Sequence, residues 1–231
     1  MSGVATDRLA TLTGATVSEE IDITRIWLVR HGETEWNATR RAQGQADVPL
    51  NDLGRLQAQD AAAQLDGVNL AGVYSSDLSR AVDTAEPIAR SQSLEVVTDP
   101  AFREIDQGSW EGLALDEIRS RWPELWGPAR HYVQRPGGES PEQVQKRALE
   151  GMARVVERHP REVVAIVSHG GTIRWIAAHA LGYDMEGSAR IRGLSNGGAV
   201  VLDATLDGGE LLLGNLVRID GKTADLEDPN A

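Results

Sequence analysis

Two short segments carry the residues best suited to chemistry. One reads LVRHGET at residues 28–34 and the other reads IVSHGGT at residues 166–172, so each places a His-Gly pair after an apolar run. In parallel α/β sheets, ligands bind beyond the carboxyl ends of the strands. If both runs are neighbouring strands, His31 and His169 face one crevice. A single histidine of this kind is as often a core or capping residue, but two matching strand ends indicate a site.

The charge beside the first histidine separates two kinds of site. Two neutral imidazoles are able to bind a metal ion. Arg30 adjoins His31, however, and a fixed cation disfavours a divalent ion next to it. An arginine donates bidentately to phosphate oxygens, and an imidazole is able to attack phosphorus and hold it covalently. The pair therefore favours a phosphate site without a metal.

These candidates need a sheet to position them, and the sequence predicts one. Short apolar runs predict strands, and apolar residues at helical spacing between caps predict helices. The strands are expected at residues 25–30, 72–75, 94–97, 162–168, 199–202 and 210–216, and the helices at 53–65, 78–90, 115–122, 141–159 and 171–181. Asn51, Asp77 and Ser140 are the expected helix starts. The alternation predicts a three-layer α/β/α fold, with a mostly parallel central sheet covered by helices on both faces.

The domain organisation follows from the same pattern. We expect one domain over residues 23–217, with residues 102–140 as an insertion over the active site. Residues 1–22 have no clear period and are expected to form a flexible N-terminal extension, and residues 218–231 a C-terminal tail.

Composition excludes several classes of function. The 231 residues include no cysteine, which excludes disulfides, cysteine-ligated zinc, iron–sulfur clusters and thiol catalysis. The net charge of −12 makes nucleic acid or an anionic membrane a poor partner for the surface as a whole. The first 22 residues lack the apolar run of a signal peptide, and no apolar stretch approaches the roughly 20 residues of a membrane span. We therefore expect a cytoplasmic protein without a membrane partner.

Six separated blocks of sequence occur in the order of a known family. They are LVRHGETEWN at 28–37, QGQADVPLNDLG at 43–54, YSSDLSRAVDTA at 74–85, FREIDQGSWEG at 102–112, PGGES at 136–140 and VSHGG at 167–171. Together they resemble the histidine phosphatase, or phosphoglycerate mutase-like, superfamily. The resemblance spans residues 25–200 and implies the α/β/α fold of that family.

The resemblance implies a role for each matching residue. His31 is the nucleophile that becomes phosphohistidine, and Arg30 and Arg80 clamp the phosphoryl oxygens. His169 stabilises the transition state from the opposite side of the phosphate. Glu104 is the general acid for the leaving oxygen and later the base that activates water. These charges agree with phosphoryl transfer, in which catalysis is mostly positioning and electrostatic stabilisation.

Other residues are expected to support this site or to stand apart from it. Asn37 donates to a phosphate oxygen or to His31, the backbone of Gly170 helps to orient His169, and Gln43 and Gly44 are candidates for the pocket wall. Asp106 and Glu111 share the loop of Glu104, so they remain alternative acids. Trp110 is expected to pack within its loop. No catalytic duty is expected of His131, His159 and His179. Solvated positions are expected for four arginines, with contact to the distal end of a substrate as the alternative; they are Arg40, Arg41, Arg130 and Arg135.

The resemblance leaves three activities to weigh. Mutases of the family carry an Asn-Glu-Arg-His-Tyr type stretch around the acid, whereas this chain has FREIDQGSWEG at 102–112 and looks like the phosphatase branch. The implied activity is that of a phosphoric monoester hydrolase, of the histidine acid phosphatase type, that acts on a small phosphorylated molecule without metal or cofactor. The alternatives are a cofactor-dependent phosphoglycerate mutase and a non-catalytic phosphate-binding module. The substrate, and whether the protein is a homodimer, stay open.

Overall fold

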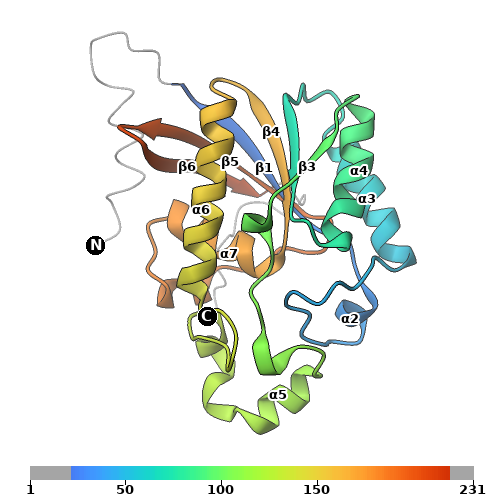
Figure 1. The fold of residues 1–231 in the computed structure, drawn as a ribbon, viewed down its shortest axis with the longest axis vertical. Coiled ribbons are helices and arrows are strands. Elements are labelled where there is room, and N and C mark those ends of the chain that lie inside the picture. The colour runs from blue at the N-terminus through green and yellow to red at the C-terminus, as the bar shows by residue number, and fades with distance from the viewer. Residues whose placement is uncertain (1–21, 219–231) are drawn as a thin grey trace.

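A central sheet organises the computed structural model, which describes residues 22–218 except for the side chains of Pro128 and Arg218 (Figure 1). Within those residues the sheet has six strands in the order β3-β2-β4-β1-β5-β6. The first four run parallel, whereas β5 and β6 form an antiparallel hairpin beside β1. The strands are β1 Thr24–Arg30, β2 Gly72–Ser75, β3 Val96–Thr98, β4 Val163–Ser168, β5 Ala199–Asp207 and β6 Glu210–Arg218.

Helices cover both faces of this sheet, which confirms the predicted three-layer fold. In Figure 1, α3 and α4 lie on one side of the sheet and α6 and α7 on the other. Ala61 and Ile88 join the core on the first face, and Met152 and Ile176 join the core on the second. The helices are α2 Glu35–Ala38, α3 Asp52–Gln64, α4 Ser79–Ser91, α5 Leu115–Arg121, α6 Pro141–Arg158 and α7 Gly170–Ala180.

The register of the two central strands brings the two histidine segments together. Arg30, the last residue of β1, lies opposite Ser168, the last residue of β4, in a parallel pair. His31 and His169 follow these two residues directly. The strand ends thus place both histidines at one edge of the sheet, as the sequence predicts.

One predicted helix start is wrong. Asp77 does not cap α4: Leu78 occupies the cap position, with no side-chain cap hydrogen bond. Instead the Asp77 carboxylate accepts two hydrogen bonds from Arg103, at 2.7 and 2.6 Å. The ionic partner lowers the pKa of Asp77 and outcompetes the backbone N–H groups. Asn51 and Ser140 do cap α3 and α6, and Ser140 forms a capping box with Gln143.

The hairpin strands are longer than the apolar runs predict. β5 continues to Asp207 and β6 to Arg218. Polar residues interrupt the apolar pattern, but they are paired: the buried carboxylate of Asp203 accepts from Nε of Arg25 at 2.9 Å. A paired polar side chain is tolerated in a strand interior, which a count of apolar residues misses.

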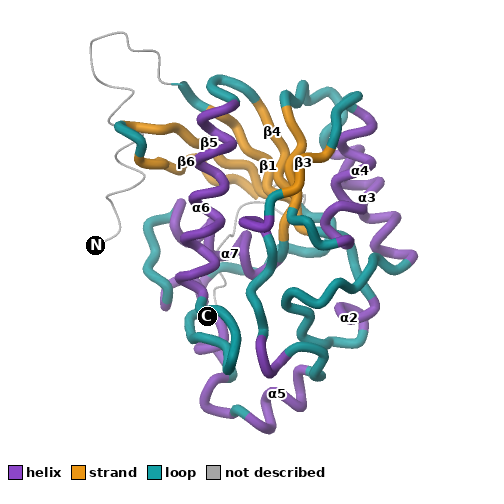
Figure 2. The backbone as a smooth tube through the Cα atoms, viewed as in Figure 1, coloured by secondary structure: helices purple, strands orange, loops and turns teal. Residues whose placement is uncertain are grey.

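The segment at residues 102–140 lies at one end of the molecule and is mostly loop and short helix (Figure 2). Its 3₁₀ helices are Gly108–Trp110, Pro123–Leu125 and Gly127–His131, and two others in the chain are Pro100–Phe102 and Glu186–Arg190. The predicted extension and tail lie outside the described residues, apart from Asp22 and Arg218. Among the described residues, no helix is long and apolar enough to cross a membrane.

Candidate active site

His31 and His169 lie beside each other beyond the ends of β1 and β4. Their ring centroids are 5.1 Å apart, and both side chains are buried. The Nδ1 atom of His31 is 2.6 Å from the carbonyl oxygen of Gly32. Because a carbonyl oxygen only accepts, Nδ1 carries the hydrogen and Nε2 keeps its lone pair. His31 therefore presents Nε2 in the form that a nucleophile needs.

Arg80 fixes the second histidine in the opposite tautomer. Its Nε donates to Nδ1 of His169 at 3.3 Å, so the hydrogen of the neutral ring is on Nε2. The terminal nitrogens of Arg80 donate to the carbonyl oxygens of Ala46 and Gly44, each at 2.7 Å. Arg80 is fully buried. The loop at residues 44–46 thus holds Arg80, and Arg80 orients His169.

Two buried donors beside these rings have no hydrogen-bond partner within the described residues. They are Nε of Arg30 and Nε2 of His169. A buried polar group without a partner costs free energy, and a bound ligand is one explanation for it. The Nη1 of Arg30 donates to the carbonyl oxygen of Leu194, which fixes the guanidinium. An anion with several oxygens would satisfy both unpartnered donors.

Burial and the two arginines keep both histidines neutral. Burial lowers the pKa of His31 well below its usual value, and the charges of Arg80 and Arg30 lower it further. Burial and then Arg80 lower the pKa of His169 in the same way. Burial also lowers the pKa of Arg80 to about 10, so Arg80 stays charged at neutral pH. The site therefore combines neutral rings with fixed cations.

The predicted residues Asn37, Gln43 and Gly44 lie around this centre as supports. The Oδ1 of Asn37 accepts from the backbone N–H of Thr34 at 3.2 Å, so the remaining polar group of this side chain, Nδ2, is a donor. Gln43 accepts from the Thr34 hydroxyl at 2.9 Å. Gly44 supplies a carbonyl to Arg80 and has a positive φ of 54°. None of the three lines the large cavity described below.

Glu104 reaches the first turn of α7 from the 102–140 segment. Its carboxylate accepts from the backbone N–H of Gly171 at 3.0 Å and of Thr172 at 3.2 Å. A Cβ at Gly171 would lie 2.5 Å from Oε1 of Glu104, and one at Gly170 would lie 3.3 Å from Nε of Arg30. The two glycines therefore let both charged groups approach the helix.

The other two carboxylates of this loop have structural partners. Asp106 accepts from the backbone N–H of Gly108 at 2.8 Å, within its own turn. Glu111 accepts from the backbone N–H of Gln45 at 2.6 Å and so holds the loop that binds Arg80. Neither lines the cavity, whereas Glu104 does. The geometry favours Glu104 as the acid.

Sequence reasoning missed an ion pair that positions Glu104. Arg147 of α6 donates to the carbonyl oxygens of Arg103 at 2.7 Å and Glu104 at 2.9 Å. It also pairs with Glu139 at 3.0 Å. Glu139 lies inside the PGGES block, which was a signal for it, but nothing in the local pattern of α6 singles out Arg147.

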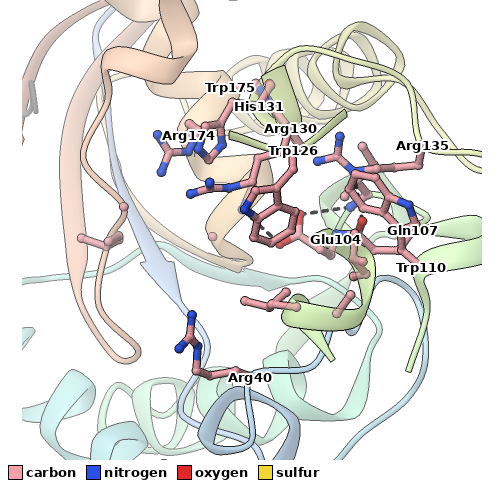
Figure 3. A pocket seen from close by; sticks show the side chains of 18 of the residues that line it. Arg40, Glu104, Gln107, Trp110, Trp126, Arg130, His131, Arg135, Arg174 and Trp175 are labelled. Carbon is pink, nitrogen blue, oxygen red and sulfur yellow. Dashed lines mark hydrogen bonds between the residues drawn. The ribbon is translucent and has the colours of Figure 1, made fainter. Parts of the chain in front are cut away.

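A cavity of about 500 Å³ opens beside the histidines (Figure 3). Arg30, Glu104 and Gly170 belong to its wall, so it continues the site around the unpartnered donors. Much of the rest comes from the 102–140 segment, including Trp110 and Trp126. Trp110 is also 3% exposed and packs near Trp122, as the predicted loop packing requires.

The expected solvated position is wrong for Arg135. This side chain is only 6% exposed, and its guanidinium lies 4.9 Å from the centre of the Trp110 ring. Arg130 is half-buried and lies 5.3 Å from the centre of the Trp126 ring. Stacking on a tryptophan face offsets part of the cost of leaving water. Tryptophans in an irregular loop give no periodic signal that predicts such stacking.

We expect the fold to lose stability as the pH falls below about 6.5. Burial, with Arg174, lowers the pKa of His131 to about 3. Between these pH values the unfolded chain binds a proton that the folded chain does not, so the free energy of unfolding falls by about 1 kcal/mol per pH unit for each such histidine. We measure the free energy of unfolding with urea at pH 6 and at pH 5. Its slope against pH should be shallower by that amount in His131→Gln than in the wild type. An unchanged slope would contradict the neutral buried state.

The described residues hold no group of three or more histidine, cysteine, aspartate or glutamate side chains that could bind a metal ion. Positive charge at the site comes from Arg30, which is half-buried, and from Arg80, which is fully buried. The chemistry of the donor set is that of an anion site.

Comparison with known proteins agrees with this geometry. The chain is 43% identical over 163 residues to Phosphoglycerate mutase-like protein 4 from Arabidopsis thaliana, covering 68% of this chain and 71% of the relative. It is 36% identical over 165 residues to Phosphoserine phosphatase 1 from Hydrogenobacter thermophilus, covering 70% and 78%. The solved structure of a mycobacterial glucosyl-3-phosphoglycerate phosphatase matches with a TM-score of 0.73 and 33% identity, covering 77% of this chain and 92% of that one.

A family model matches a single stretch of the chain, residues 26–216. That stretch includes both histidine segments, the Arg80 helix and the Glu104 loop. It is the model of the histidine phosphatase superfamily, branch 1, and the chain belongs to this family.

Proposed function

We propose that this protein is a metal-independent phosphatase that hydrolyses a phosphate monoester through a phosphohistidine at His31. The observation that carries the proposal is the pairing of an unprotonated Nε2 on His31 with the two unpartnered buried donors on Arg30 and His169. A phosphoryl group set between them would accept from both donors while facing the nucleophile. The relatives named as phosphatases support the same activity.

The first step transfers the phosphoryl group to the protein. Nε2 of His31 forms a bond to phosphorus as the ester P–O bond breaks. Arg30, Arg80 and the Nε2–H of His169 stabilise the charge on the equatorial oxygens, with the amide of Asn37 as a further donor. Glu104 gives a proton to the leaving oxygen. The monoanionic phosphate ester supplies this proton to Glu104 when the side chain starts as a carboxylate.

The second step returns His31 to its starting form. Glu104, now a carboxylate, takes a proton from a water molecule that attacks phosphorus. The N–P bond breaks, and the electron pair returns to Nε2 of His31. Inorganic phosphate and the alcohol are the products, so no cofactor is consumed.

Hydrolysis is favoured over the mutase reaction by the loop around Glu104. A mutase must keep water from the phosphohistidine, and the 102–112 stretch departs from the mutase pattern. The relatives include proteins named for each activity, such as a probable phosphoglycerate mutase from Cronobacter sakazakii at 35% identity. We also propose a cytoplasmic location, on the composition described above.

We expect release of inorganic phosphate from p-nitrophenyl phosphate after dialysis against EDTA, at the same rate as before dialysis. The reason is that Arg30 and Arg80 already supply the positive charge that a metal ion would supply. The measurement is phosphate release with and without added Mg²⁺, Mn²⁺ or Zn²⁺. Activity that disappears and returns only with a divalent ion would contradict the metal-independent scheme, and saturable binding without release would indicate a phosphate-binding module.

A further inference from the structure

The cavity beside the phosphoryl site is strongly cationic, although the chain as a whole carries a net charge of −12. Its wall includes five arginines and a single carboxylate, that of Glu104. Arg30 belongs to the phosphoryl site, and Arg174 donates to the backbone carbonyls of Ser188 and Ile191. The remaining three are Arg40, Arg130 and Arg135, which the mechanism does not use.

Arg135 is a buried charge held by neutral groups. Its Nε donates to Oε1 of Gln107 at 3.0 Å and its Nη1 to the carbonyl oxygen of Val133 at 2.8 Å. No carboxylate within residues 22–218 lies within ion-pair distance of it. Burying a charge without a counter-charge is costly. Its other terminal nitrogen, Nη2, has no hydrogen-bond partner among the described residues, and Arg135 lines the cavity, so this nitrogen is an available donor.

Arg130 adds a second cation to the same wall. Its side chain donates to the carbonyl oxygen of Gly127 at 3.3 Å and lies over Trp126. Figure 3 shows Arg130 and Arg135 reaching the cavity that Glu104 also lines. Burial lowers the pKa of Arg135 to about 10, and the negative charge of Glu104 opposes that shift, as it does at Arg30 and Arg80. One carboxylate therefore lies within electrostatic reach of both the phosphoryl site and Arg135.

We propose that the substrate carries a second anionic group, a carboxylate or a second phosphate, on its leaving group, and that Arg135 and Arg130 bind it. This inference rests on the proposed function, because it takes the phosphoryl site as the place of the first anion. Glu104, the proposed proton donor to the leaving oxygen, lines the same cavity as Arg130 and Arg135, which is why the second anion is placed on the leaving group. Phosphate monoesters with a neutral leaving group leave Arg135 without a counter-charge.

Matched pairs of esters test the proposal. 3-Phosphoglycerate and glycerol 3-phosphate differ only in a carboxylate against a hydroxymethyl group. 1,3-Propanediol bisphosphate and its monophosphate test a second phosphate in the same way. Because a hydrogen bond to a charged group contributes about 1.5–3 kcal/mol, we expect kcat/KM to be about 10- to 100-fold higher, in at least one pair, for the member that carries the second anionic group. The pair that shows the preference identifies the second anion.

Two variants connect that preference to the residues. Arg135→Gln should bring the ratio of kcat/KM within a pair to nearly 1, and Arg135→Lys should restore part of it. Arg130→Gln should lower the ratio independently, which covers the case in which Arg135→Gln does not fold. Arg119→Gln, at an exposed position on α5, is the matched control and should leave activity and ratio unchanged. Equal kcat/KM within both pairs, or a ratio that survives both glutamine variants, would overturn the proposal.

A binding measurement separates this inference from the proposed function. Trp110, Trp126 and Trp175 line the cavity, so their fluorescence reports occupancy without turnover. Titration of His31→Ala with 3-phosphoglycerate and with glycerol 3-phosphate should show the same preference, lost when Arg135→Gln is added. If the wild type hydrolyses no ester, the proposed function fails, and the binding preference alone decides whether the second anion site exists.

Discussion

His31→Ala should lower kcat by about 10⁴-fold or more and should abolish the phosphorylated protein intermediate. Replacing a nucleophile that acts as a unit with its partners removes nearly all catalysis. His169, the histidine beside it, cannot take this role, because its Nε2 carries the hydrogen, whereas Nε2 of His31 keeps its lone pair. The intermediate is measured by mixing enzyme with radiolabelled ester, denaturing in alkali and counting label in the protein before and after exposure to acid.

A histidine at the far end of α7 gives the matched control. His179 is exposed, on the last turn of that helix, and His179→Ala should retain wild-type activity and label. Label that persists in folded His31→Ala, or turnover near the wild-type rate, would place the nucleophile at another residue and end the proposed mechanism.

Glu104→Gln should slow poor leaving groups far more than good ones. An alkyl phosphate releases an alkoxide that needs a proton as the bond breaks, whereas p-nitrophenolate hardly needs one. General acid catalysis contributes about 10²–10⁴-fold, so the loss in kcat/KM should approach that range for alkyl esters and shrink for p-nitrophenyl phosphate. The measurement compares both esters in the wild type and in the variant.

Asp106→Asn is the control for this test. Asp106 lies in the same loop as Glu104, but its carboxylate accepts a hydrogen bond from the backbone N–H of Gly108, within its own turn. It should lose little activity with either ester. Equal losses for both esters in Glu104→Gln would remove the acid role, and a leaving-group-dependent loss in Asp106→Asn would assign that role to Asp106.

The histidine segments show what the sequence predicts well. Apolar runs that end in His-Gly are local patterns, and the parallel register of β1 and β4 then dictates that His31 and His169 meet. Arg80 illustrates the limit: its place after a strand end predicts a site residue, but its hydrogen bonds to Gly44 and Ala46 depend on a distant loop. Local sequence patterns predict helices and strands, whereas the detailed geometry of the site depends on hydrogen bonds between residues that are distant in the sequence.

The misassigned residues have a common physical cause. Aspartate is a common helix cap, yet Asp77 pairs with Arg103, which is a stronger partner than the backbone N–H groups of the helix and comes from outside its segment. The sequence predicts a solvated charge at Arg135, yet this side chain is buried, where it stacks on Trp110 and donates to Gln107. In both cases a contact distant in sequence overrides the local preference, and a single sequence carries no direct signal for it.

The parallel pairing of β1 with β4 has a consequence for how such enzymes diversify. His31 and His169 directly follow two neighbouring central strands, where backbone hydrogen bonds on both sides give the highest resistance to local opening. The substrate contacts that we propose come instead from the 102–140 segment, which consists mostly of loops and short helices, and such segments tolerate replacement. Provided that Glu104 is kept, substitutions there can change which molecule is selected while the two histidines and their arginines persist, so most of the selectivity can evolve separately from the chemistry.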